Sequence, residues 1–308
     1  MKLKKLSFLN CALLIVIALV SCNHNNNASD NSNDQFTSGS YHFIFDSSLS
    51  PILDQELYVY KSIFPDAKPI VSYQPENKIL DQILNDKSRF AVMGSPLNAE
   101  EVKLLTNRSL PPKIGKIAID AITLIVAKNS PDSLMLLSEV KNLLNNNTKS
   151  NKSLVFDSPN SSIINYLKKL SGVRQMEQKN VYALKDSKEV IKYVATHQNA
   201  IGFISYSWLT EPDADYAVAA QNIKVVGIKD ENSKDAPQIY FKPNQSTLAL
   251  KQYPLQRSVY VVDCTGRIGL GTGFAAFLQS ERGQKIVLRS GLLPDSMPRR
   301  EINIKNDL

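Results

Sequence analysis

The chain has 308 residues, of which 43% are hydrophobic, and carries a formal net charge of +7. This length predicts two domains or one large one, and the hydrophobic fraction is enough to fill ordinary cores. The positive charge is modest and is not gathered into a Lys/Arg stripe with interleaved aromatic residues, which argues against a nucleic-acid-binding protein. The cysteines are Cys11, Cys22 and Cys264, and the first two fall in the N-terminal segment, so no disulfide framework is expected.

Residues 1–21 have the pattern of a secretory signal peptide. Three lysines precede an apolar run at residues 11–20, which is shorter than the roughly 20 residues that a membrane-spanning helix needs. The sequence LVSC at residues 19–22 matches the bacterial lipobox, in which cleavage leaves the thiol of Cys22 linked to diacylglycerol. The alternative is an ordinary signal peptide followed by an incidental cysteine. We therefore predict a protein of the bacterial cell envelope, lipid-anchored to a membrane through Cys22 and facing the periplasm.

Removal of the signal peptide takes away three lysines and no acids, so the formal charge falls to 7 − 3 = +4. The next segment, residues 22–40, is rich in Asn, Ser and Asp and almost free of large apolar side chains. Such a composition cannot bury enough apolar surface to order itself, so we predict a disordered tether.

Strands alternate with helices from residue 41 onward. Strands are predicted at 41–46, 68–73 and 90–93, and helices at 51–64, 76–86 and 98–105. This alternation is typical of an α/β fold with a parallel sheet and helices on both of its faces.

The apolar stretch at residues 116–127 is too long for one ordinary strand and predicts a segment that passes from one lobe to another. A second α/β unit follows, with helices at 137–144 and 186–196 and strands at 200–205 and 223–228. The strand at 258–263 is interpreted as the return crossing, followed by helices at 273–279 and 282–289. The prediction is two α/β lobes, one made of residues 41–122 and 262–308 and the other of residues 123–261, with a ligand cleft between them.

The stretch LVFDSPNSSIINY at residues 154–166 predicts a buried strand that turns into a helix at two serines. The first N–H groups of a helix lack intrahelical partners and carry partial positive charge, so such a turn can bind an anion. The alternative is that Asn160 or Ser161 only caps the helix, as these residue types commonly do. Ligands of open α/β sheets bind outside the carboxyl ends of the strands. The candidate ligand-binding residues at those ends are Ser47, Ser48, Gly94, Ser95, Asn160, Ser161 and Ser162.

Several short motifs resemble the substrate-binding proteins of phosphate ABC importers, in the lipoprotein form found in Bacteroidetes-type bacteria. They are YPLQR at 253–257, GFAAFL at 273–278, SERGQ at 280–284, GLLP at 291–294, AIGF at 200–203 and Asp120-Ala121. The resemblance extends from residue 41 to the C-terminus. It implies a type II periplasmic-binding-protein fold, two crossover segments, and a monomer that binds phosphate or a similar oxyanion and docks on ABC permease subunits. We predict no cofactor, no metal and no catalytic residues.

In that family Ser/Thr hydroxyls, a helix N-terminus, an Arg and an Asp hold the oxyanion between the lobes. The hydroxyl positions fall on Ser47 or Ser48 after the first strand and on Ser161 and Ser162 at the helix start. The Asp, which accepts a proton from protonated phosphate and so discriminates against sulfate, falls on Gly94.

The charged contacts of the family are therefore changed in this sequence. The family Arg falls on Asp157, as the family Asp falls on Gly94. Asp120, Arg89 and Arg257 are the charged residues that could substitute. Asp120 is predicted either as a hinge residue bonded to backbone or as a ligand contact, because a buried lone carboxylate needs a donor. For Arg257 an interlobe or surface salt bridge is favoured.

An enzyme is not expected. The histidines are His24, His42 and His197, and no Gly-x-Ser-x-Gly elbow or metal-ligand spacing accompanies them. The glycines at 269, 271 and 273 fit neither a Walker A loop nor a dinucleotide fingerprint, and a plain loop is favoured there. Besides the receptor, two alternatives remain: a degenerate binding-protein fold with an interaction or sensory role and no phosphate binding, and a hydrolase that uses a serine in the cleft.

Overall fold

The structure is a computed structural model that describes residues 34–145, 150–176 and 178–296, all within one compact unit. The predicted signal peptide, Cys22 and the tether up to residue 33 lie outside the described residues. Within these three ranges, no helix combines the length and the apolar character needed to cross a membrane.

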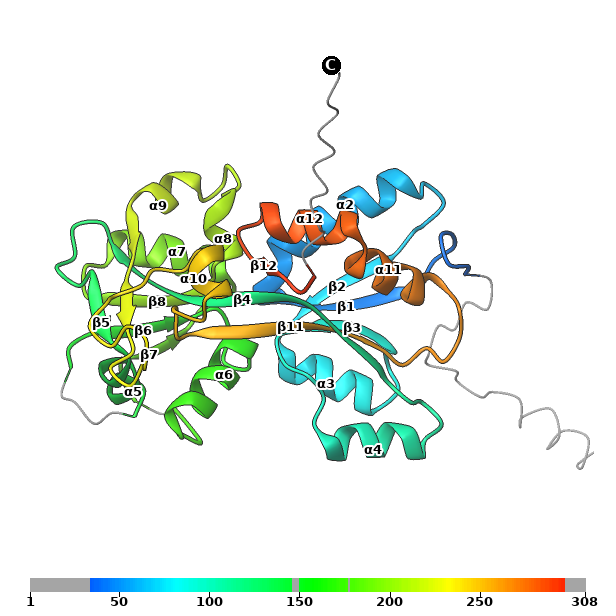
Figure 1. Cartoon of the computed structure of the whole chain (residues 1–308), viewed down its shortest axis with the longest axis horizontal. Helices are drawn as coiled ribbons and strands as arrows, with labels where there is room; N and C mark the ends of the chain where they lie inside the picture. The colour runs from blue at the N-terminus through cyan, green and yellow to red at the C-terminus, as the bar shows by residue number, and fades with distance from the viewer. Residues whose placement is uncertain (1–33, 146–149, 177, 297–308) are drawn as a thin grey trace, which may run out of the picture. The chain divides into compact units, whose positions relative to one another are not determined.

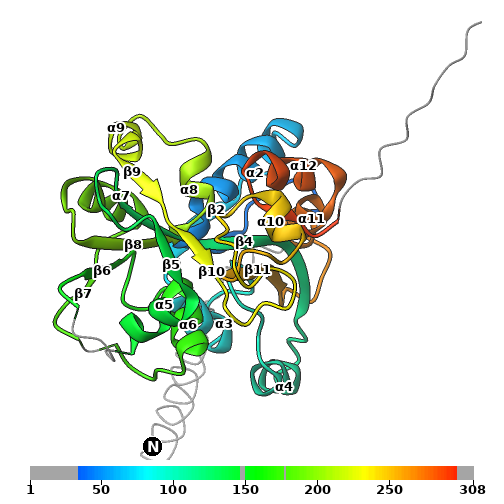
Figure 2. The same ribbon diagram turned by 60° about the vertical axis from the view of Figure 1, so that its left-hand side comes forward.

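A mixed sheet runs through the described residues in the order β2-β1-β3-β11-β4-β8-β6-β7, with β9 and β12 also paired to β4 (Figure 1). Its strands are β1 (His42–Asp46), β2 (Ile70–Gln74), β3 (Phe90–Met93), β4 (Lys113–Ala127), β6 (Ser153–Phe156), β7 (Val181–Ala183), β8 (Ala200–Ser205), β9 (Ile223–Val225), β11 (Gln256–Asp263) and β12 (Leu293–Pro294). A separate two-stranded sheet pairs β5 (Leu134–Leu136) with β10 (Gly227–Lys229), in front of the second half of the large sheet (Figure 2).

Strand β4 belongs to both halves of the sheet. Its first half pairs antiparallel with β11 and β12, and its second half pairs antiparallel with β8 and β9. β11 runs beside β4 and also pairs with β3, so it returns the chain to the first half. The two predicted crossings are therefore confirmed. We call the half with β1, β2 and β3 the first lobe and the half with β6, β7 and β8 the second lobe; the lobe boundaries at residues 122 and 262 stay predictions.

Helices cover both faces of the first lobe (Figure 1). They are η1 (Ser47–Leu49), α2 (Ser50–Ile63), α3 (Glu76–Leu84), α4 (Ala99–Asn107), α11 (Leu270–Gln279) and α12 (Glu281–Arg289). One core packs α2, α11 and α12 on the sheet, with Phe274 stacked 5.2 Å from Phe43 between ring centroids. The other core packs α3 and α4 on the opposite face, where the β1 side chain Ile44 points. Alternate β1 side chains thus enter opposite cores, as strand geometry requires.

The second lobe has the same layered arrangement. Its helices are α5 (Leu137–Leu144), α6 (Ser162–Ser171), α7 (Ser187–Thr196), α8 (Ser207–Thr210), α9 (Ala217–Gln221) and α10 (Gln245–Ala249). One face packs α5, α6 and α10 around the stacked rings of Phe156 and Phe203, and the other packs α7, α8 and α9 around Trp208. Both lobes therefore have their own hydrophobic cores, and the sheet continues between them.

The tether prediction is wrong for residues 34–40. Asp34 is buried; its carboxylate pairs with Arg267 and accepts a hydrogen bond from the Leu270 amide at 2.6 Å. This carboxylate lies at the first turn of α11, where negative charge is favourable. The predicted glycine loop is also wrong, because α11 begins at Leu270 and includes two of the glycines. Gly273 leaves the space that the backbone carbonyl of Phe36 occupies.

The strand predicted at 223–228 is divided. β9 pairs with β4 in the large sheet, whereas β10 pairs with β5 in the small one. Val226, between them, is fully buried in the second-lobe core. A run that is continuous and apolar in the sequence is thus shared by two sheets. The apolar pattern alone does not show where it divides.

Candidate ligand-binding site

Strand β1 ends in a carboxylate that organises the turn after it. Asp46 is fully buried, and its Oδ1 accepts hydrogen bonds from the Ser48 amide and the Ser48 hydroxyl, both at 2.9 Å. Asp46 is thereby the cap of η1, and Ser48 is held in one position. Its second oxygen, Oδ2, is buried without a hydrogen-bond partner among the described residues.

Helix α6 brings a second pair of hydroxyls from the other lobe. Ser161 is the N-cap, with its Oγ accepting from the Ile164 amide at 3.3 Å, so the capping prediction holds for this residue. Ser162, the first helical residue, is buried, and its Oγ lies 3.2 Å from Ser48 Oγ. The N-terminus of α6 and the turn after β1 therefore meet at these two hydroxyls.

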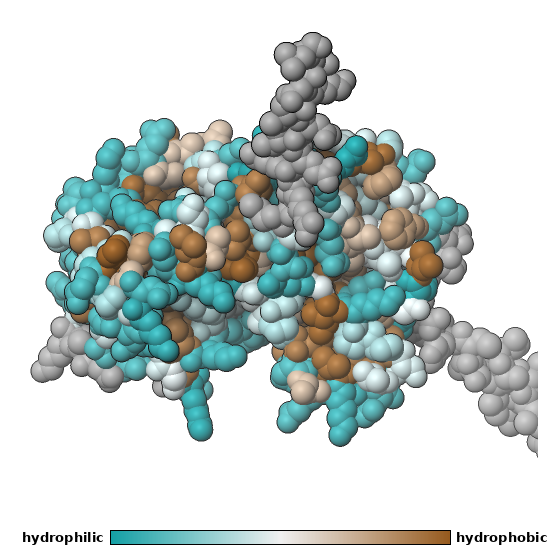
Figure 3. Space-filling model, in the orientation of Figure 1, coloured by the Kyte–Doolittle hydropathy of each residue, from teal (hydrophilic) through white to brown (hydrophobic). Residues whose placement is uncertain are grey.

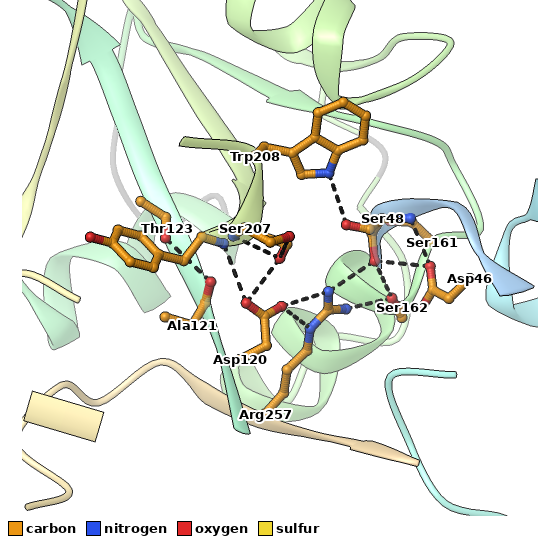
Figure 4. A network of polar contacts seen from close by, with 12 residues as sticks. Asp46, Ser48, Asp120, Ala121, Thr123, Ser161, Ser162, Ser207, Trp208 and Arg257 are labelled. Atoms are coloured by element: carbon orange, nitrogen blue, oxygen red, sulfur yellow. Dashed lines mark hydrogen bonds and ion pairs between the residues drawn. The ribbon is translucent and has the colours of Figure 1, made fainter. Parts of the chain in front are cut away.

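The guanidinium of Arg257, on β11, lies at this meeting point (Figure 4). Its Nη1 donates to Ser162 Oγ at 2.5 Å and its Nη2 donates to Ser48 Oγ at 2.8 Å. The side chain is 2% exposed. An arginine thus links the two lobes where the turn after β1 meets the N-terminus of α6.

Asp120, on β4, is the ionic partner of Arg257. Its Oδ2 accepts a hydrogen bond from Arg257 Nε at 2.9 Å and forms an ion pair with Nη2, also at 2.9 Å. Its Oδ1 accepts from the Ser205 hydroxyl at 2.9 Å and from the Tyr206 amide at 3.3 Å. Burial raises the pKa of the Asp120 carboxyl, and the Arg257 charge opposes that shift. Asp120 thus has the crossing-strand position and the backbone bond of the hinge alternative, and Arg257 forms its salt bridge with this residue, its neighbour on the paired crossing strand.

More carboxylates than cations surround this position. Asp46, Glu76 and Asp120 all act on Arg257 through their charge. Asp157 is 2% exposed, and burial raises its pKa to about 7, with the charge of Asp46 adding to the shift. The Ser161 hydroxyl lies close enough to lower that pKa slightly, yet neither Asp157 oxygen accepts a well-formed hydrogen bond from a described residue. A buried carboxyl with few donors favours its protonated form.

Glu76, at the start of α3, is a further buried acid of the first lobe. Its Oε1 accepts from Ser95 Oγ at 2.6 Å, and its Oε2 accepts from Asn165 Nδ2 of the second lobe at 3.0 Å. Burial raises the pKa of Glu76, and the charge of Asp46 acts in the same direction. Its place in the first turn of α3 also suits a negative charge. Glu76 therefore joins the lobes as well as complementing the helix dipole.

Gly94 follows β3 and lies against this network. A Cβ at this position would lie 2.9 Å from Arg257 Nη1 and 2.9 Å from Ser162 Cβ. Such distances are shorter than real Cβ contacts, so any side chain here would displace the arginine or separate the lobes. The glycine is thus required by the position of Arg257.

A cleft opens beside Arg257, with a volume of about 450 Å³. Figure 3 shows the surface hollowed where the lower parts of the two lobes face each other. The wall of this cleft includes α3 and the segment after β3 from the first lobe, α6 from the second lobe, and strand β11. Its lining includes Gly94, Ser162 and Arg257, and we call the part of the cleft at these three residues its inner end.

A family model described as the PBP superfamily domain matches residues 33–282, which is most of the chain. The chain belongs to the PBP superfamily. No curated protein sequence matches it significantly.

Solved structures with the same fold include several phosphate-binding proteins. A putative phosphate ABC transporter substrate-binding protein from Clostridium perfringens, with bound phosphate, has a TM-score of 0.68 and 19% identity, with 84% of this chain and 100% of that one covered. An ABC-type phosphate transport receptor from Vibrio cholerae has a TM-score of 0.62 and 14% identity, with coverage of 83% and 100%. A possible phosphate binding protein from Planctomyces limnophilus has a TM-score of 0.57 and 17% identity, with coverage of 83% and 93%. At these identities the likeness shows the fold, which is the type II periplasmic-binding-protein fold.

Within this PBP-superfamily protein, the residues predicted as ligand-binding separate into two groups. Ser48, Gly94, Asp120 and Ser162 lie together around Arg257, with Ser161 capping α6 beside them. Ser47 is half-buried at the start of η1, and its backbone carbonyl accepts from the Ser50 amide. Ser95 is committed to Glu76, and Asn160 is exposed, with its Oδ1 accepting from Asn77 at 3.4 Å.

Some members of the network were not among the predicted contacts. Trp208 Nε1 donates to the Ser48 carbonyl at 2.8 Å across the lobes, and Asp46 fixes Ser48 from behind. The Asp-Ser-Ser sequence at the end of β1 was a signal for Asp46, since such a residue caps the turn that follows it. Nothing local marks Trp208, because its partner is 160 positions away in sequence.

Proposed function

We propose that this protein is a lipid-anchored solute-binding receptor of an ABC importer, and that it binds phosphate or a similar small oxyanion between its two lobes. The observation that carries the proposal is the convergence of Ser48 Oγ, Ser162 Oγ, the α6 N-terminus and the Arg257 guanidinium at one point between the lobes. Hydroxyls, a helix N-terminus and an arginine fork are the donors that oxyanions require.

In this proposal the ligand takes over hydrogen bonds that the protein now makes with itself. Arg257 has five N–H donors. Nε and Nη2 face Asp120, while Nη1 and Nη2 also face the two serine hydroxyls. When an oxyanion enters, the bonds from Arg257 to the serines are replaced by bonds from all three side chains to the ligand, and the Ser48 hydroxyl turns its proton from Asp46 Oδ1 to the ligand. The Asp120 pair keeps the guanidinium in place during this exchange.

The surrounding acids determine which oxyanion suits the site. Asp157, with a pKa raised by burial to about 7, is able to carry a proton and donate it in a hydrogen bond. Asp46 has one oxygen, Oδ2, that lacks a partner among the described residues and can accept a hydrogen bond from a P–OH donor. Fully ionised sulfate offers no such proton and is repelled by the carboxylates. Protonated phosphate is therefore favoured over sulfate, and binding strengthens as pH falls from 8 to 6.

The membrane anchor and the permease belong to the same proposal. The motif LVSC at residues 19–22 supports lipidation of Cys22, and residues 23–33 supply a tether from the anchor to the folded part. Closure of the lobes around the ligand would present the closed form to the permease subunits. We expect the protein to act as a monomer at the periplasmic face of the membrane.

Isothermal titration of the full-length chain in detergent with inorganic phosphate and sulfate tests this proposal. We expect phosphate to bind and the Ser48→Ala variant to lose about tenfold or more in affinity, since a hydrogen bond to a charged group is worth about 1.5–3 kcal/mol. Ser62→Ala, at an exposed position on α2, is the matched control and should bind normally. Absence of binding to every oxyanion in the folded protein would refute the receptor proposal.

One observation favours the alternative of a degenerate binding-protein fold with an interaction or sensory role. The Arg257 guanidinium already makes bonds with both serines and lies within close contact of the Gly94 backbone position. In that case Arg257 is a permanent lock between the lobes. The same titration decides between the two, because a locked protein binds no oxyanion and its Ser48→Ala variant changes only stability.

A further inference from the structure

We infer that the ligand of this site is a phosphate monoester with a polar organic group, and that free phosphate is the weaker ligand. This inference rests on the proposed function, because it assigns the oxyanion end of the ester to Arg257, Ser48 and Ser162. It adds a second part to the site, the cleft beside Arg257, which would hold the organic group.

The lobes are already in contact through two sets of hydrogen bonds besides those of Arg257. Trp208 Nε1 donates to the Ser48 carbonyl at 2.8 Å, and Asn165 Nδ2 donates to Glu76 Oε2 at 3.0 Å and to Asn77 Oδ1 at 2.8 Å. These bonds join the first lobe to the second. The described arrangement is therefore a closed one, and further closure would need these contacts to be compressed.

The cleft persists in this closed arrangement. Its volume of about 450 Å³ lies within the range of roughly 300–1,000 Å³ that is typical of pockets for organic ligands. Inorganic phosphate is far smaller and would occupy only the inner end at Gly94, Ser162 and Arg257. The remaining volume is open to a group attached to the oxyanion, and a monoester keeps a terminal phosphoryl group for the inner end while directing its ester oxygen outward.

The lining of the cleft indicates the character of that group. Apolar surface comes from Leu80, Met93 and Pro96, and hydrogen-bonding groups come from Asn77, Gln256 and Ser258. This mixture suits a group with both carbon surface and hydroxyls. A purely aliphatic chain would leave the amides without partners, which is costly for polar groups removed from water.

The charges of the cleft wall favour an uncharged organic group. Glu76 and Glu101 are balanced by Lys169 and Arg257, so the wall as a whole carries no formal excess of either sign when all four are ionised. A second strong charge on the ligand would therefore meet a wall with no net formal charge to attract it. A hydroxylated group such as that of a glycerol or sugar phosphate meets these conditions.

The test compares inorganic phosphate, sn-glycerol 3-phosphate and glucose 6-phosphate by isothermal titration of the full-length chain in detergent, with glycerol and glucose as controls without the oxyanion. We expect at least one ester to bind about tenfold or more tightly than phosphate. The Ser258→Phe variant places a ring in the cleft and should weaken the esters by about tenfold relative to phosphate, since the ring competes for the same volume. Ser62→Phe, exposed on α2, is the matched control.

The outcomes separate the two proposals. Phosphate that binds as tightly as either ester, or a Ser258→Phe change that weakens phosphate and esters equally, overturns this inference and leaves the receptor proposal intact. Absence of binding to phosphate and both esters overturns both. The comparison of ligands on the unmodified protein does not depend on the folding of any variant.

Discussion

The ion pair between Asp120 and Arg257 makes a direct prediction about stability. Asp120→Asn keeps the size of the side chain but removes the charge that faces the guanidinium. Asp120 is fully buried and Arg257 is 4% exposed, so water cannot replace the lost partner. Removing one member of a buried pair costs about 3–5 kcal/mol, because the other charge stays buried without compensation.

Two features of the site place the expected cost at the lower end of that range. Asp46 and Glu76 also act on Arg257 through their charge and continue to do so in the variant. We therefore expect Asp120→Asn to lower the free energy of unfolding by about 3 kcal/mol. At about 2–4 °C per kcal/mol for a protein of this size, the thermal midpoint should fall by about 6–12 °C.

Urea unfolding followed by circular dichroism at pH 7 measures this cost. Asp235→Asn, at an exposed position, is the matched control and should change the unfolding free energy by less than about 0.5 kcal/mol. The double variant with Arg257→Met should be less destabilised than the sum of the two single variants, because it leaves no isolated buried charge. A cost below about 1 kcal/mol for Asp120→Asn, or strict additivity in the double variant, would refute the reasoning.

Three further variants test other parts of the site. Gly94→Ala should weaken phosphate binding about tenfold in titrations and lower the unfolding free energy by about 1–3 kcal/mol, since its methyl group would lie 2.9 Å from Arg257 Nη1 at the lobe junction. Burial raises the pKa of Asp157 in the folded protein to about 7, from an ordinary 3.8, so its contribution to the free energy of unfolding falls as pH rises from about 4 to 7. Asp157→Asn should remove that fall, and urea unfolding at pH 8 should show a free energy of unfolding higher by on the order of 4 kcal/mol. Ser161→Ala should cost about 1 kcal/mol in the same assay through loss of the α6 cap.

Each of these variants has an outcome that contradicts its reasoning. Normal phosphate binding by Gly94→Ala would mean that Arg257 moves away from this position when the ligand enters. An unchanged pH dependence in Asp157→Asn would mean that its carboxyl is not held in the protonated form. If Ser161→Ala loses phosphate binding completely as well as stability, Ser161 contacts the ligand in addition to capping α6.

The sequence by itself determined the fold class and half of the residues of the candidate site. Alternating strand and helix patterns gave two α/β lobes, and the overlong apolar run at β4 gave the crossing, because hydrophobic periodicity is a local property of the chain. Ser48 and Ser162 could be predicted for the same reason, since each lies at the carboxyl end of a strand where a helix begins. The burial of residues 34–40 could not be predicted from the sequence. It depends on the Phe36 carbonyl lying against Gly273 and on the Asp34 carboxylate reaching the start of α11, and both partners are more than 200 positions away in sequence.

Only the tertiary structure decided how the charges are arranged. Arg257 is 95 positions from Ser162 and 209 from Ser48 in sequence, yet it donates to both hydroxyls. The position of Arg257 explains why residue 94 is a glycine. From the sequence, Gly94 could be described only as the position where the related family has an aspartate. Whether a buried charge is paired depends on which side chains the folded sheet brings together. Ion pairs between residues far apart in sequence cannot be predicted from the residues next to either partner.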